Sequence, residues 1–400
     1  MMGQVETFDV VVIGGGPAGA TAAWDLAREG RSVLLLDKAG RIKPCGGAIP
    51  PRLIRDFAIP DHLIVARAQA ARMIAPSRQI VNMPIEGGYV GMVDREDFDE
   101  WLRVRAAESG AVRRAGHFES LTRDDDGVSR VAYRDNAADE AAPAVQVRAL
   151  SVIGADGARS RVARSLSKEA ERMPCVFAYH EIIKSPASGA RDFDGRRCDV
   201  YYQGHLSPDF YAWIFPHGDT ASIGVGSAQK GFSLRGAVKA LRADAGLADC
   251  ETVRTEGAPI PLRPLRRWDN GRDTVLAGDA AGVVAPASGE GIYYAMQGGR
   301  EAATAVDALL RTGKARELAG ARKRFMRAHG QVFMVLGIMQ HFWYRNDKRR
   351  ERFVTMCADP DVQHLTWQAY MNKELVRAKP GAHARIFMKD MGHLLGLSPS

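Results

Sequence analysis

The feature that most constrains the fold of this chain is a glycine-rich turn near its N-terminus. Three glycines, Gly14, Gly16 and Gly19, follow an apolar run at 10–13 with the spacing G-x-G-x-x-G. A strand that enters such a turn and a helix that leaves it, expected here over 21–29, begin a nucleotide-binding βαβ unit. The second glycine lets the backbone approach a pyrophosphate, and the helix N-terminus offers free N–H groups to the phosphates.

A second apolar run at 32–36 completes this unit and ends in Asp37. An acid about 20 residues after the turn is suited to bind a ribose hydroxyl. Strand, turn, helix, strand and acid stand in the expected order, so the sequence predicts a dinucleotide site. The plainer alternative is a structural β–α turn that holds no ligand.

Two later turns also carry glycine and aspartate after an apolar run. The run at 150–153 leads to Gly154-Ala155-Asp156-Gly157, and the run at 274–277 leads to Gly278-Asp279. Ligands of α/β proteins bind at the carboxyl ends of strands, which makes both aspartates candidates, although Asp156 could simply cap the next helix. After Asp279, the amides at 289–292 open a helix expected over 293–310 and suit a developing negative charge.

Composition narrows the class of protein. The chain has 400 residues, 46% of them hydrophobic, and a formal net charge of +8. This length suggests two or more packed units of a globular enzyme, and the basic excess favours anionic lipids or phosphorylated ligands. We recognise no nucleic-acid-binding module. Five scattered cysteines without a C-x-x-C pair argue for a reducing compartment and against a disulfide framework or a metal site.

The apolar segments are short. No basic segment followed by a long apolar run opens the chain, so we expect no signal peptide and a cytoplasmic protein. The run at 332–339 has eight residues, whereas a membrane span needs about 20. The apolar-aromatic helix expected at 331–344, followed by a basic patch at 345–352, suits a peripheral contact with a bilayer, and an ordinary packing helix explains it equally well.

The middle of the chain reads as strands at 63–92 and 173–265, with hairpin loops at 124–144. On the strand at 210–216, Tyr211, Trp213 and Phe215 should share one face. Such a row either lines an apolar pocket or belongs to ordinary sheet core. Arg95 opens a helix, where a cation is favoured only beside an anionic ligand or in water. Cys45 lies in a loop at 43–51, either near a cofactor ring or as a buried thiol.

Together these motifs resemble the flavoprotein superfamily typified by p-hydroxybenzoate hydroxylase. Within it, Pro44-Cys45-Gly46-Gly47, the strand that carries Tyr211, Trp213 and Phe215, and Gly289-Glu290-Gly291-Ile292 are similar to the geranylgeranyl reductase family, most of all to its photosynthetic branch. The resemblance implies an α/β fold with a Rossmann-like FAD-binding domain at 1–62, 93–168 and 268–315. A mixed β-sheet substrate domain would occupy 63–92 and 169–267, and a helical C-terminal region 316–400.

The same resemblance implies an activity. The enzyme would use FAD and NADPH to reduce stepwise three isolated double bonds of a geranylgeranyl group, on (bacterio)chlorophyll or on geranylgeranyl diphosphate. Tyr211, Trp213 and Phe215 would line the isoprenoid channel, and Cys45, Tyr211 and Glu290 are candidate catalytic groups. The cofactor would be held by Gly14, Gly16, Pro17, Ala18, Gly19, Asp37, Lys38, Cys45, Gly46, Gly47, Ala48, Arg95, Asp156, Gly157, Gly278, Asp279, Pro286, Gly289, Gly291 and Ile292.

Three other functions stay open at this point. The first is an FAD-dependent aromatic monooxygenase of the same fold, the second an archaeal-type isoprenoid lipid reductase, and the third a pigment-binding flavoprotein that is not an enzyme. Many hydroxylating relatives carry histidine where this chain has Gly282, which favours reduction. We expect a geranylgeranylated partner, a peripheral contact with the photosynthetic membrane, no nucleic acid and no metal.

Overall fold

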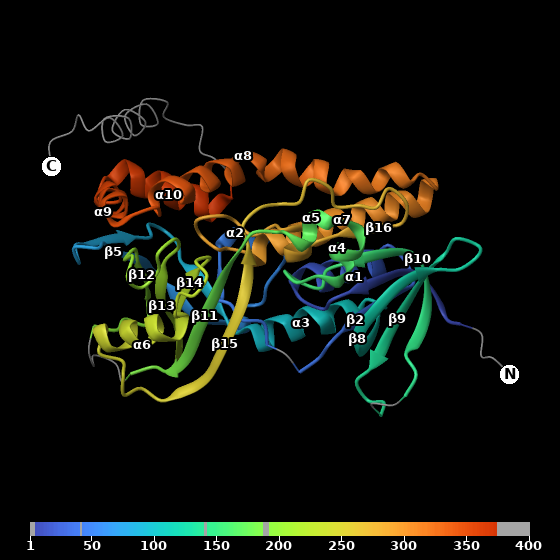
Figure 1. The fold of residues 1–400 in the computed structure, drawn as a ribbon, viewed down its shortest axis with the longest axis horizontal. Helices are drawn as coiled ribbons and strands as arrows, with labels where there is room; N and C mark the ends of the chain where they lie inside the picture. Colours follow the sequence, from blue (N-terminus) through green and yellow to red (C-terminus); the bar gives the residue numbers. More distant parts are fainter. Residues whose placement is uncertain (1–4, 41, 140–141, 187–191, 374–400) are drawn as a thin grey trace. The chain divides into compact units, whose positions relative to one another are not determined.

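The computed structural model describes residues 5–40, 42–139, 142–186 and 192–373 (Figure 1). They form two compact units, each of which is described by itself. The first unit comprises Met1–Lys43, Arg95–Val176 and Pro259–Gly330, and the second comprises Pro44–Asp94, Phe177–Ala258 and Gln331–Ser400. The division into FAD-binding, substrate and C-terminal parts made from the sequence stays a prediction.

A largely parallel sheet is the centre of the first unit. Strands β8 (Val112–Arg123), β2 (Val33–Asp37), β1 (Thr7–Ile13), β10 (Val145–Gly154) and β16 (Thr274–Leu276) run parallel in that order. Val10, Val11 and Val12 are fully buried, as expected for a strand that is covered on both faces. Helices α1 (Pro17–Arg28), α3 (Arg95–Glu108) and α7 (Ile292–Thr312) belong to this unit, and α1 packs against both others.

Two sequence expectations for this unit need correction. Helix α1 begins at Pro17 rather than at 21, because proline at the first helical position lacks only an N–H that needs no partner there. The stretch 124–144 is more than loop: it contains β9 (Ser129–Asp135), which pairs antiparallel with β8 and β10. Ser129, Val131 and Tyr133 are buried at every second position, which is the period of a strand.

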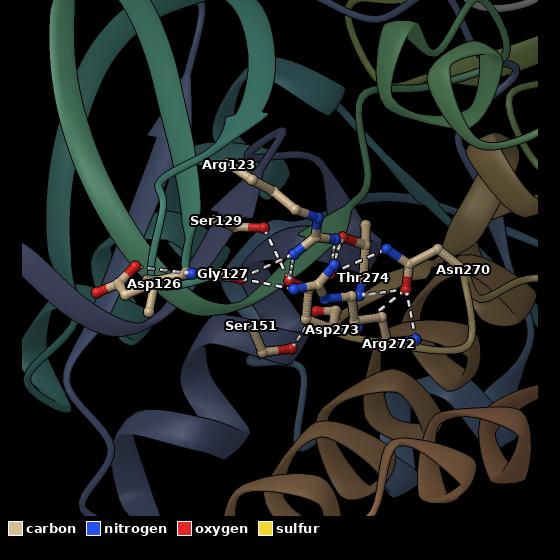
Figure 2. A network of polar contacts seen from close by, with 10 residues as sticks. Arg123, Asp126, Gly127, Ser129, Ser151, Asn270, Arg272, Asp273 and Thr274 are labelled. Atoms are coloured by element: carbon tan, nitrogen blue, oxygen red, sulfur yellow. Dashed lines mark hydrogen bonds and ion pairs between the residues drawn. The ribbon is translucent and has the colours of Figure 1, made fainter.

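A cluster around Asp273 joins the β8–β9 hairpin to the residue before β16 (Figure 2). The Asp273 carboxylate accepts two hydrogen bonds from Arg123, at 2.5 and 2.8 Å, and one each from Ser129 and Asn270, at 2.9 Å. Burial alone would raise the pKa of Asp273, but these donors outweigh it and lower the pKa to about 2. The carboxylate is therefore an ionised structural anchor.

A mixed sheet of seven strands dominates the second unit. Its order is β15–β11–β14–β13–β12–β5–β6, in which β12 (Arg197–Tyr201) and β5 (Ala70–Ile74) are parallel. The other strands are β15 (Thr252–Pro261), β11 (Cys175–Lys184), β14 (Thr220–Ser227), β13 (Ala212–His217) and β6 (Ile80–Pro84). Helix α6 (Leu234–Asp244) supplies Val238 and Leu241 to an apolar core that includes Ala212 and Ile214 of β13. A small sheet of β3 (Ala48–Ile49), β7 (Val90–Val93) and β4 (Ile64–Ala68) completes the β structure.

The C-terminal part is helical, as predicted. It contains α8 (Ala319–Trp343), α9 (Asp347–Met356) and α10 (Pro360–Asn372), and the helical segments predicted up to residue 397 lie outside the described residues beyond Lys373. The expected basic patch at 345–352 loses one member, because Arg350 is buried and donates to Tyr344 O at 2.6 Å and to Asp347 Oδ1 at 2.7 Å. None of the helices that the structure describes combines the length and apolar character needed to cross a bilayer.

The short elements are α2 (Pro51–Asp56), α4 (Arg161–Leu166), α5 (Lys168–Glu171), and the 3-10 turns η1 (Asp61–Leu63), η2 (Gly278–Ala281) and η3 (Ala315–Leu318). Turn η2 follows β16 and carries Gly278 and Asp279, the third glycine motif of the sequence analysis. The mixed sheets, the Rossmann-like part and the helical C-terminal region confirm the predicted fold class.

Candidate functional site

The first two glycine motifs of the sequence meet in the first unit. Ala155 donates its N–H to Ile13 O at 2.8 Å, which places the Gly-x-Asp-Gly turn beside the turn after β1. A Cβ atom on Gly14 would lie 2.6 Å from Ala155 C, and Gly14 has a φ of +109°. Only glycine therefore fits here, both for its backbone conformation and for the close approach.

The third motif joins them through helix packing. A Cβ on Gly278 would lie 2.7 Å from the Ala18 Cβ of α1, and α1 also packs against α7, which follows this motif. Gly19 is similarly restricted, because a Cβ there would overlap Gly14 O. The three glycine turns, which are far apart in sequence, thus lie together in one unit.

Helices α1 and α7 begin without the usual side-chain cap. Their N-cap residues are Gly16 and Gly291, and neither first turn contains an acid. Other helices are capped by a side chain, for example α4 by Ser160 and α6 by Ser233. A Cβ on Gly16 would meet nothing within 4 Å among the described residues. Open space beside uncapped N–H donors fits the phosphates of a dinucleotide.

Asp37 braces the first glycine turn. Its Oδ2 accepts the N–H of Gly15 and its Oδ1 accepts that of Ala39, both at 2.8 Å. The following residue, Lys38, accepts a backbone hydrogen bond from the Asn136 side chain. Contact of Asp37 and Lys38 with a ribose stays a prediction, and the observed role of Asp37 is to hold the turn.

Asp279 forms an ion pair that the sequence reasoning missed. Its buried carboxylate accepts from the Lys43 ammonium group, and a Cβ on Gly291 would lie 3.8 Å from its Oδ1. The carboxylate therefore stands beside the start of α7, together with a cation from the loop that precedes Cys45. The only sequence signal for Lys43 is its place two residues before that cysteine.

Two other predicted cofactor residues have structural partners. Arg95 is buried and donates to both carboxylate oxygens of Asp99, at 2.8 and 2.6 Å, so the interpretation as a solvated arginine is wrong. Asp156 accepts from the Ser160 hydroxyl and, at 2.7 Å, from the N–H of Arg161, and burial raises its pKa. It holds the start of α4, which was the plainer alternative. Contact of Arg95 with FAD, and of Asp156 with FAD or NADPH, stays a prediction.

The loop before α7 is a compact turn. Gly289 has a φ of +66° and donates its N–H to Ala285 O at 3.0 Å, and Ala285 donates to Glu290 O at 2.9 Å. Glu290 is buried, and Pro286 opens the loop. The turn delivers Gly291 and Ile292 to the first turn of α7, where their amides were predicted to face the cofactor.

In the second unit, the loop with Cys45 is held by a histidine. His217 Nε2 donates to Gly46 O at 3.1 Å, and a Cβ on Gly47 would lie 2.5 Å from His217 Cε1. Burial lowers the pKa of His217 to about 4, so the ring is neutral at pH 7. The Gly47 N–H donates to Cys45 Sγ at 3.4 Å, which orients the thiol within the loop.

The aromatic row predicted on the strand at 210–216 exists. The ring centroids of Tyr211 and Trp213 lie 5.9 Å apart, and those of Trp213 and Phe215 lie 6.1 Å apart. The alternate residues, Ala212 and Ile214, face the core beneath α6 instead. A Cβ on Gly46 would lie 3.0 Å from Phe215 Cδ2, so the Cys45 loop packs directly on this row.

A buried polar chain behind the row was not foreseen. Trp213 Nε1 donates to Ser222 Oγ at 3.1 Å, and Ser222 lies 2.9 Å from His180 Nδ1. His180 Nε2 lies 2.9 Å from Glu256 Oε2. Because the Glu256 carboxylate only accepts, Nε2–H donates to it. In the neutral ring Nδ1 then accepts from the Ser222 hydroxyl, which itself accepts from the indole N–H. A Cβ on Gly224 would lie 2.5 Å from Trp213 Cε2, so the indole packs directly against Gly224 of β14.

Among the residues that the structure describes, no three histidine, cysteine, aspartate or glutamate side chains are grouped as metal ligands would be.

Comparison with known proteins gives a consistent result. Residues 7–332 match the model of a family described as FAD binding domain. A geranylgeranyl diphosphate reductase of Rhodobacter capsulatus is 56% identical over 392 residues, which cover 98% of both chains. A digeranylgeranylglycerophospholipid reductase of Methanopyrus kandleri is 32% identical over 76% of this chain and 81% of its own. The crystal structure of a geranylgeranyl bacteriochlorophyll reductase-like protein from Thermoplasma acidophilum has a TM-score of 0.80 at 22% identity, covering 95% of this chain and all of the other.

Proposed function

Because the chain belongs to the geranylgeranyl reductase family of FAD-binding proteins, we propose that it uses NADPH to reduce the isolated double bonds of a geranylgeranyl group to the phytyl level. The group is carried either by diphosphate or by (bacterio)chlorophyll. The full-length relative at 56% identity supports the reaction class, and that relative is named for the diphosphate substrate.

The first unit fits FAD. The open space at Gly16, the uncapped N-termini of α1 and α7, and the carboxylates of Asp37 and Asp279 are suited to its phosphates and hydroxyls. In this proposal Gly14, Gly16, Gly19 and Asp37 hold the adenosine half, and Asp279, Gly291 and Ile292 the flavin half. Bound FAD supplies two-electron transfer between NADPH and the alkene.

The observation that carries the proposal is the packing of the Cys45 loop on the aromatic row. Gly46 lies against Phe215 and Trp213, so the thiol loop and an apolar wall are neighbours within one unit. An isolated alkene is not polarised by a carbonyl, so its reduction needs a proton placed at one carbon where water is excluded. The Cys45 thiol lies in the loop beside this wall and is our candidate proton donor, and neutral His217 fixes its loop.

Tyr211 and Glu290 are the other candidate proton donors. The Tyr211 ring is buried against Phe210, with ring centroids 4.3 Å apart, and Glu290 is buried before α7. Cys45 is preferred because its loop directly contacts the wall proposed to hold the substrate. Tyr211 then serves mainly as part of that wall.

A peripheral contact with a membrane is the second part of the proposal. Met334 and Ile338 of α8 are 60% and 63% exposed, and they lie four residues apart on one helix face. Arg345, Lys348 and Arg349 follow in the chain. This arrangement suits insertion of the apolar pair into an anionic bilayer.

Co-sedimentation with anionic vesicles should fall for the double variant Met334→Ser/Ile338→Ser and not for the control Val253→Ser. Equal vesicle binding by the double variant and the control would contradict the membrane contact.

The test of the reaction is mass spectrometry after anaerobic incubation with FAD and NADPH. Geranylgeranyl diphosphate and geranylgeranyl-bacteriochlorophyll are supplied separately, and the expected products gain one, two and then three H₂. Whichever substrate reacts identifies the physical carrier of the group. If neither gains mass while the flavin is reduced, the proposal fails. NADPH oxidation that consumes oxygen and depends on an aromatic compound would favour the monooxygenase. Gain of H₂ only by an unsaturated ether lipid would favour the archaeal-type reductase.

A further inference from the structure

A pocket of about 350 Å³ in the first unit is lined by seven residues, three of which are arginines. One wall follows α5 and contains Arg172 and Met173, and the other wall contains Arg263, Leu265 and Arg266. The volume is within the range of small-ligand sites. No cofactor residue named above lies among the residues that line it.

The charges in this pocket are not balanced. Among the described residues, no carboxylate pairs with the guanidinium group of Arg172, Arg263 or Arg266. The single acid of the lining, Glu169, uses Oε2 to accept the backbone N–H of Arg266 at 3.1 Å. Three cations around one carboxylate repel one another and favour a polyanion between them. Arg267, the next residue, does have a carboxylate partner, Asp269 at 3.4 Å.

The pocket adjoins the turn that carries Asp279. Leu265 donates its N–H to Ala281 O at 3.0 Å, so the arginine segment is fixed to the end of η2. Gly282 has a φ of +79°, and a Cβ there would overlap Arg263 O and lie 3.2 Å from Met173 Sδ. Gly282 thus lets both walls approach the turn. This packing explains why glycine occupies the position, independently of the reaction catalysed.

We propose that this pocket binds the phosphate groups of a reactant, with Arg172, Arg263 and Arg266 as the ligands. Guanidinium groups bind phosphate oxygens in bidentate geometry, and phosphate or diphosphate supplies the charge that the three arginines lack. The inference rests on the proposed function, which offers two sources of this chemistry: the diphosphate of the prenyl substrate and the phosphates of NADPH.

The experiment compares Arg172→Gln, Arg263→Gln and Arg266→Gln with the control Arg267→Gln in flavin-loaded protein. Equilibrium binding is measured for inorganic diphosphate, geranylgeranyl diphosphate, geranylgeraniol, NADPH and NADH. Each pocket variant should bind the phosphate ligand about tenfold more weakly, as expected for loss of a charge-assisted hydrogen bond, and the control should bind it as wild type does. All four side chains are exposed, so the variants should fold, which unchanged flavin content and melting temperature will verify.

The pattern of losses identifies the source. If the variants bind geranylgeranyl diphosphate more weakly while their binding of geranylgeraniol and NADPH is unchanged, the pocket holds the prenyl diphosphate. If they bind NADPH more weakly while their binding of NADH is unchanged, the pocket holds the nicotinamide nucleotide. Binding of all probes within twofold of wild type in all three variants would overturn the proposal. Because binding is measured without turnover, a protein that reduces no prenyl group but shows these losses would refute the proposed function and keep the pocket.

Discussion

Replacement of Ser222 by alanine tests whether buried hydrogen bonds hold the aromatic row in place, and it should lower the stability of the protein. Ser222 is fully buried, and its hydroxyl accepts from Trp213 Nε1 and donates to His180, which is itself only 2% exposed. Ser222→Ala removes both interactions without a change in shape beyond one oxygen atom. It leaves an indole N–H and an imidazole nitrogen without a partner in the interior of the sheet.

The magnitude follows from the two groups left behind. A buried polar group that loses its partner costs about 1–3 kcal/mol, so two of them should lower the free energy of unfolding by about 3 kcal/mol. That is more than about a hundredfold in the folding equilibrium. In a Trp213→Phe background only the imidazole nitrogen is stranded, so the same substitution should cost at least about 1 kcal/mol less.

The assay is urea unfolding of wild type, Ser222→Ala, Trp213→Phe and the double variant, followed by circular dichroism. Ser185→Ala is the matched control, because its hydroxyl donates to Gly218 O at an exposed position, and it should change stability by less than about 0.5 kcal/mol. A cost for Ser222→Ala no larger than the control, or an equal cost in both backgrounds, would refute the hydrogen-bond chain. Under the proposed function, release of the indole should also raise the fraction of partly reduced tails.

Three further outcomes are expected. Gly16→Val should lower FAD affinity at least about a hundredfold while the melting temperature of the flavin-free protein stays unchanged, because its side chain would enter open space; retained flavin would contradict the site. Cys45→Ala should lower turnover at least about tenfold with FAD still bound, and unchanged turnover would make Cys45 a packing residue. The pKa of Asp273, about 2 against an ordinary 3.8, means that its stabilisation is present above pH 4 and lost as pH falls from 4 to 2. Wild type should lose about 2 kcal/mol in that window and Asp273→Asn should not, as acid titration of unfolding will test.

Local chemistry explains why part of the fold could be predicted from the sequence. The turn after β1 needs glycine at Gly14 because of its positive φ, and at Gly19 because the helix crosses the turn closely. Apolar residues before such a turn form a buried strand in almost any context. Likewise, alternation along a strand determines that Tyr211, Trp213 and Phe215 share a face, whatever that face contacts.

Other features were misjudged because the same residues suit two environments. Ser129, Val131 and Tyr133 form a strand only because β8 and β10 supply partners on both sides. The sequence alone allows Arg95 to be a solvated cation, whereas in the structure it is buried and pairs with Asp99, one helical turn later. The sequence places Arg350 in a basic surface patch, whereas in the structure it is buried and donates to Tyr344 O and to the Asp347 carboxylate.

The sequence by itself determined the βαβ nucleotide turn, because that turn depends on steric requirements between near neighbours, and it carried the family resemblance in its short motifs. Only the tertiary structure decided what the side chains contact. Lys43 and Asp279 pair across 236 residues, His217 and Gly46 across 171, and His180 and Ser222 across 42. Each of these residues could equally stand in water, and partners so distant in sequence leave no periodic pattern. The three arginines of the pocket beside η2 likewise become a group only when the chain has folded.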